Sequence, residues 1–218
     1  MENIWCILYK NHFLFYFCRY NKEAPIFFVI MPTTSKRLDE LVKRAQKGDT
    51  EAFGKVYELL LEDVFRYIYF RVGSNDAGDL AEDTFVRAWE KLHTYSTQKH
   101  GSFRSWVFTI AHNIVVDYYR KERVIVPLDV IGPLEQEDIT SNPDFHINGV
   151  FSVDLIARAI RSLKEDAQQV IILKYINELS YAEIAASMKK SETAIRIIAH
   201  RGLKELKRII EKMYPSSN

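Results

Sequence analysis

The chain has 218 residues, 47% of them hydrophobic and 27% charged, with a formal net charge of +1. This ordinary globular balance excludes collagen-like, low-complexity and wholly disordered chains. Two cysteines exclude a disulfide-dense scaffold, and the near-neutral charge means that any nucleic-acid partner must meet a local basic patch.

Residues 1–30 differ abruptly in composition from the rest of the chain. They hold nine of the 28 aromatic residues and both cysteines, Cys6 and Cys18. Charged residues interrupt every apolar run, so we expect neither a membrane span nor a signal peptide. We interpret Met31 as the true start of translation and residues 1–30 as a start-site artefact; a genuine N-terminal extension is the alternative. From Met31 onward the chain has no cysteine, which excludes thiolate-ligated zinc there.

Residues 31–123 are predicted to form a first domain made of helices. Apolar residues step by three or four from Val56 to Val72, and Gly73 follows as a glycine that ends a helix. The same spacing predicts helices over about 75–93 and 103–123.

The helix predicted over 75–93 carries a cluster of carboxylates beside two aromatic residues, Phe85 and Trp89, which we expect to be exposed. No histidine accompanies the carboxylates, which argues against a metal site. We therefore interpret this face as a protein-docking surface, and a merely solvated face is the alternative. Its acidic members are Asp76, Asp79, Glu82 and Asp83.

The helix predicted over 103–123 has a polar face opposite its apolar stripe. Before it lies a polar loop, residues 94–102, followed by Phe103 and Arg104. Aromatic and basic side chains together suit unpaired bases, which stack on rings and are held by positive charge. The alternative is that the aromatic residues are core, which we expect for Trp106. The polar face consists of Asn113, Asp117, Arg120 and Lys121.

Residues 124–151 are predicted to be an extended acidic linker, because they hold three prolines, two glycines, several carboxylates and no Lys or Arg. Residues 152–213 again show helical spacing and form a second small domain. No segment shows strand alternation. The fold class is therefore all-α, with two small helical domains joined by the linker.

The second domain contains a predicted helix-turn-helix. Ser180 and Glu183 form a capping box at the start of a short helix, and Ser191 is placed to cap a longer one. Between Lys189 and Lys212 there are eight basic and three acidic residues, a local charge of +5. Such a unit places its second helix in the DNA major groove; a basic, solvated helical hairpin is the alternative. Thr193, Arg196 and His200 are candidates for base contacts, and Arg201 and Lys204 for phosphate contacts.

No catalytic motif is present. The chain lacks a phosphate-binding glycine loop, a His-Glu-x-x-His pair and a nucleophile elbow, and its six histidines are scattered. We therefore expect no enzyme activity, no metal site, no cofactor and no small-molecule substrate.

Four motifs, in order, resemble those of the extracytoplasmic-function (group IV) sigma factors of bacterial RNA polymerase, over Leu38 to Ile210. They read Gly48-Asp49-x-x-Ala52-Phe53, Asp79-Leu80-Ala81-Glu82-Asp83-Thr84-Phe85-x-x-Ala88-Trp89, Phe103-x-x-Trp106-x-x-x-Ile110-Ala111-x-Asn113-x-x-x-Asp117-x-x-Arg120, and Leu179-Ser180-Tyr181-x-Glu183-Ile184-Ala185 with His200-Arg201 downstream. The resemblance implies an alternative sigma factor that directs promoter recognition, DNA melting and transcription initiation. It also implies core RNA polymerase, promoter DNA and an anti-sigma factor as binding partners, and a cytoplasmic location.

The resemblance also implies roles for residues. Residues 31–123 correspond to sigma region 2 and 152–213 to sigma region 4. Asp79, Glu82, Asp83, Phe85 and Trp89 would bind core polymerase. The minus-10 element would be bound by Phe103, Arg104, Asn113, Asp117, Arg120 and Lys121. The minus-35 element would be bound by Thr193, Arg196, His200, Arg201 and Lys204.

One feature departs from the family pattern. The helix-turn-helix turn, usually Leu-Gly-[apolar]-Ser, is here Met188-Lys189-Lys190-Ser191. Without the glycine, a non-glycine residue is expected at positive φ, and Lys190 replaces an apolar anchor. Two other classes of protein remain as alternatives: a stand-alone helix-turn-helix regulator, which would be a dimer, and a structural adaptor.

Overall fold

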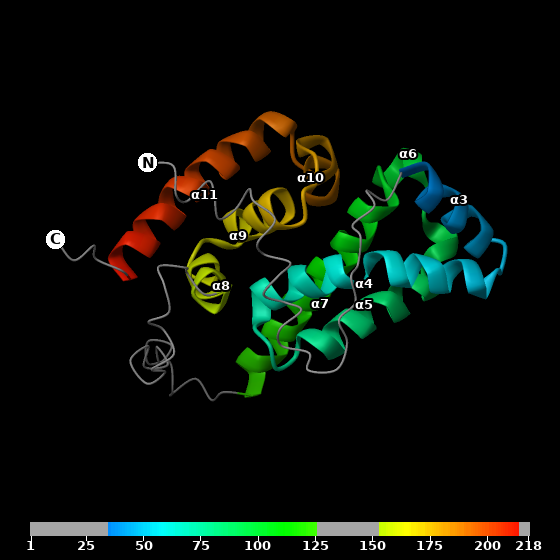
Figure 1. Ribbon diagram of the computed structural model, residues 1–218, viewed down its shortest axis with the longest axis horizontal. Helices are drawn as coiled ribbons and strands as arrows, with labels where there is room; N and C mark the ends of the chain where they lie inside the picture. The colour runs from blue at the N-terminus through cyan, green and yellow to red at the C-terminus, as the bar shows by residue number, and fades with distance from the viewer. Residues whose placement is uncertain (1–34, 126–152, 214–218) are drawn as a thin grey trace, which may run out of the picture.

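The computed structural model describes residues 35–125 and 153–213, and within these ranges it is helical with no strand (Figure 1). The all-α prediction is confirmed. The expectations for residues 1–30, and for all but the first residues of the linker, lie outside the described residues. None of the described helices is long and apolar enough to cross a membrane.

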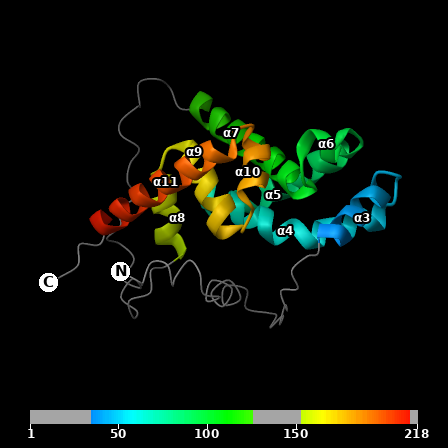
Figure 2. The same ribbon diagram turned by 90° about the horizontal axis from the view of Figure 1, so that it is seen from above.

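The helices form two groups that lie against each other (Figures 1 and 2). The first group comprises α3 (Ser35–Ala45), α4 (Thr50–Val72), α5 (Ala77–Glu90), the 3-10 turn η1 (Leu92–Thr94), α6 (Thr97–His100) and α7 (Phe103–Ile125). The second comprises α8 (Val153–Arg161), α9 (Glu165–Ile171), the π-helical turn η5 (Ile172–Ile176), α10 (Tyr181–Met188) and α11 (Glu192–Met213). Within the described ranges, α4 and α8, and α7 and α10, make the main contacts between the groups.

Local signals in the sequence set several helix ends. Asp49 caps α4 by accepting a hydrogen bond from Ala52 N at 2.9 Å, and Gly73 ends that helix with φ of 100°. The capping box of Ser180 and Glu183 is formed. Ser191 Oγ accepts from Ala194 N at 3.2 Å and so caps α11. The helix expected over 75–93 is shorter than predicted, since α5 ends at Glu90 and a 3-10 turn follows.

The core of the first group forms around α4, which packs on α3, α5 and α7. Its largest fully buried rings are Tyr67, Phe70, Phe103 and Phe108. In the second group, α11 lies close to α9 at Gly202: a Cβ there would stand 3.3 Å from side-chain atoms of Ala167 and Ile171. The opposite face of the long basic helix is exposed to solvent.

The turn of the helix-turn-helix has the predicted unfavourable backbone. Lys189 is left-handed, with φ 53° and ψ 41°, where a family glycine would be unstrained. A non-glycine side chain in this backbone region costs about 1–2 kcal/mol. Lys190, in place of an apolar anchor, forms an ion pair from Nζ to Asp166 Oδ2 of α9 at 3.0 Å. The turn is thus held by backbone hydrogen bonds to α10, by Met188 packing against the core and, at position 190, by a surface ion pair in place of an apolar contact.

Candidate nucleic-acid interface

The outer face of α11 presents all five residues predicted for the minus-35 element. Thr193, Arg196, His200, Arg201 and Lys204 are exposed. Thr193, Arg196, His200 and Lys204 are spaced by three or four residues and share one face of the helix, and Arg201 lies at its edge.

Arg196 and Glu183 have defined surroundings next to that face. The Arg196 guanidinium lies 4.3 Å from the centre of the Tyr181 ring and 3.5 Å from Glu192 Oε2. Burial raises the pKa of the Glu183 carboxyl, but hydrogen bonds from Ser180 and Ser102 outweigh burial and lower it overall. Glu183 is therefore ionised at neutral pH and keeps both the α10 cap and its bond to Ser102.

Ile197 lies in the middle of this face, and sequence reasoning missed it. Its side chain is 46% exposed, whereas the next residue, Ile198, packs against the core. The helical spacing of the sequence could have placed Ile197 on this face, because position 197 is four residues after Thr193 and four before Arg201.

The acidic face of α5 is exposed at Asp79, Glu82 and Asp83. Trp89 is 39% exposed and lies with its ring centre 4.8 Å from that of Phe53. The expected exposure of Phe85 is wrong: it is 4% exposed and packs edge-on against Tyr57 of α4.

Val86, which the sequence analysis did not select, takes the exposed position beside Phe85 and is 57% exposed. The exposed part of this surface therefore consists of three carboxylates, Val86 and Trp89, with Phe85 beneath it.

The predicted minus-10 residues on α7 divide into two kinds of surroundings. Asn113, Arg120 and Lys121 are exposed, and Asp117 is half-buried between Arg87 (3.4 Å) and Arg120 (2.9 Å). Phe103 is 1% exposed and packs against Tyr95 and Trp106, so its ring is not available to a base in this arrangement. Trp106, 6% exposed, is core as expected.

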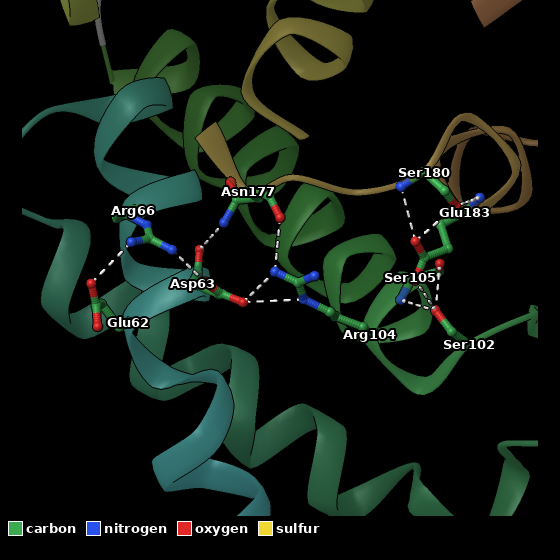
Figure 3. Close-up of polar contacts among 9 residues, drawn as sticks. All are labelled: Glu62, Asp63, Arg66, Ser102, Arg104, Ser105, Asn177, Ser180 and Glu183. Atoms are coloured by element: carbon green, nitrogen blue, oxygen red, sulfur yellow. Dashed lines mark hydrogen bonds and ion pairs between the residues drawn. The ribbon is translucent and has the colours of Figure 1, made fainter. Parts of the chain in front are cut away.

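The polar loop predicted over residues 94–102 is partly helical, because it contains α6. Its last residue, Ser102, and the following Arg104 lie against the second group of helices (Figure 3). Arg104 Nε donates to Asp63 Oδ2 at 3.1 Å, and its Nη2 donates to the backbone oxygen of Asn177 at 2.8 Å. Ser102 Oγ donates to Glu183 Oε1 of α10 at 2.9 Å. The structure thus leaves the α5 and α11 faces open and covers part of the predicted minus-10 surface.

Among the described residues, no group of three or more histidine, cysteine, aspartate or glutamate side chains is placed to hold a metal ion.

Two protein-family models match the chain. The model described as Sigma-70 region 2 matches residues 56–124, and the model described as Sigma-70, region 4 matches residues 154–206. These segments correspond to α4–α7 and α8–α11.

Individual proteins show the same relationship. The ECF RNA polymerase sigma factor BldN of Streptomyces coelicolor is 34% identical over 177 residues, which cover 81% of this chain and 67% of that protein. Among solved structures, CnrH in complex with the cytosolic domain of CnrY matches with a TM-score of 0.60 and 23% identity, covering 82% of this chain and 99% of that chain. The sigma factor RpoE in complex with the anti-sigma factor NepR, from Bartonella quintana, matches with a TM-score of 0.59 and 22% identity. The match covers 73% of this chain and 96% of that chain. At these identities the two structures show a shared fold.

Proposed function

The chain belongs to the sigma-70 family, among its extracytoplasmic-function (ECF) sigma factors, and we propose its function from this premise. It binds core RNA polymerase and brings the polymerase to specific promoters, where it assists DNA melting. The observation that carries the proposal is the pairing of two surfaces on one chain. An acidic and apolar face on α5 and a basic face on α11 stay exposed at the same time. A DNA-binding protein that acts alone needs only the second.

The proposed division of labour follows the two groups of helices. Residues 31–123 act as region 2: the α5 face binds the polymerase, and the segment 94–102 with the polar face of α7 holds melted DNA. Residues 152–213 act as region 4, with α11 at the minus-35 element. Stacking and phosphate contacts offset the cost of unpairing a base, a few kcal/mol. The protein acts without a cofactor and performs no catalysis itself.

An anti-sigma factor is a further proposed partner, and the proposed location is the cytoplasm, where core polymerase and the chromosome are. The support is that two similar folds were solved as complexes, CnrH with CnrY and RpoE with the anti-sigma factor NepR.

The test is co-purification of the full chain with core RNA polymerase, followed by transcription of genomic DNA from the source organism in vitro. We expect a stoichiometric complex whose RNA 5′ ends map to discrete sites sharing two upstream sequence elements. A second preparation beginning at Met31 shows whether residues 1–30 are needed. Failure to form a complex, together with nanomolar binding of the free protein to a promoter duplex, would instead favour the stand-alone regulator.

A further inference from the structure

Ile197 is an aliphatic residue on the exposed face of α11. Single exposed aliphatic residues are common on protein surfaces, so exposure alone says nothing. Ile197, however, lies among Thr193, Arg196, His200 and Arg201, in the N-terminal half of the helix that the proposed function places in the major groove. An isoleucine there loses its contact with water whenever the cations around it meet DNA.

The major groove offers this side chain one apolar group. Base edges present hydrogen-bond donors and acceptors, and only thymine adds a methyl group, at C5. The neighbouring side chains supply the polar contacts: Arg196 is held beside the Tyr181 ring, and Arg201 lies one turn after Ile197. Ile197 has no polar atom and contributes nothing to phosphate binding.

We propose that Ile197 reads a thymine in the minus-35 element through its 5-methyl group. The proposal rests on the proposed function of α11 and makes Ile197 a specificity-determining residue. Burial of one methyl group corresponds to about a fourfold change in affinity.

The experiment replaces each thymine of a mapped minus-35 element, one at a time, by deoxyuridine, which lacks only the methyl group. Binding to the complex of the full chain with core polymerase is measured by fluorescence anisotropy. At one position, we expect the wild-type complex to bind about fourfold more weakly, and Ile197→Ala to be insensitive to the same replacement. Ile197→Leu, which keeps an apolar side chain, should restore sensitivity. Val116→Ala changes another exposed apolar residue, on α7 and outside the second group of helices, and should keep the wild-type sensitivity to the same deoxyuridine replacement.

The inference is overturned if no thymine is sensitive in the wild type, or if Ile197→Ala remains sensitive at the same thymine. Both outcomes leave specific promoter binding intact. A complex that binds no promoter would instead contradict the proposed function itself.

Discussion

Replacing Asp83 and Trp89 with alanine is expected to weaken binding to core RNA polymerase at least 100-fold while leaving the fold intact. Both side chains lie on the exposed face of α5, and tryptophan is among the residue types most enriched in interface hot spots. Truncating one hot-spot residue costs about 2 kcal/mol or more, so a 100-fold loss, about 2.7 kcal/mol, requires only a small further loss at the second residue. Co-purification and a fluorescence titration with labelled core polymerase measure the effect.

Two controls separate this loss from unfolding or a general charge effect. Trp89 packs against Phe53, an aromatic contact worth about 0.5–1.5 kcal/mol, so thermal unfolding should shift by a few degrees without loss of helical circular dichroism. Asp39→Ala/Glu40→Ala removes two exposed carboxylates from α3 and should bind normally. Trp89→Phe, which keeps a ring at the position, should retain part of the affinity. Undiminished binding by Asp83→Ala/Trp89→Ala would remove α5 from the polymerase interface.

Replacing Arg196 and Arg201 with alanine is expected to reduce promoter-dependent transcription about 100-fold at limiting complex, with polymerase binding unchanged. Arg196 is placed for a base edge, where a good contact contributes about 1–3 kcal/mol, and Arg201 for a phosphate. Losing the phosphate contact should also reduce the salt dependence of promoter binding by a slope of about 0.9. Run-off transcription and anisotropy at several salt concentrations measure both effects.

Lys207→Ala/Lys212→Ala is the matched control. It removes the same charge from the same helix, but from its C-terminal half, away from the proposed groove contacts. We expect at most a small loss of transcription. Equal losses in the two pairs would mean that α11 acts through overall charge and does not read sequence. A loss of polymerase binding in the Arg196/Arg201 variant equal to that in the Asp83/Trp89 variant would contradict the division between the two groups of helices.

The sequence by itself determined those features that depend on a few neighbouring residues. Asp49, Gly73 and the Ser180–Glu183 capping box set helix ends through hydrogen bonds and backbone angles within one turn. The missing glycine at Lys189 correctly predicted a left-handed residue in the turn. The basic patch of α11 was visible as well, because all its charges lie on one helix.

Only the tertiary structure decided which helical faces are covered. Helical spacing groups Phe85 with Trp89, yet the packing of α5 on α4 buries Phe85 against Tyr57 and leaves Trp89 partly exposed. Both rings contact an aromatic residue of α4, with ring centres 4.8 Å apart in each pair. Arg104 is another case: its partners, Asp63 and Asn177, are 41 and 73 residues away. Such contacts depend on how separate helices pack, and no local pattern encodes that packing. The candidate surfaces could therefore be found in the sequence, but whether each is open or covered is a property of the folded chain.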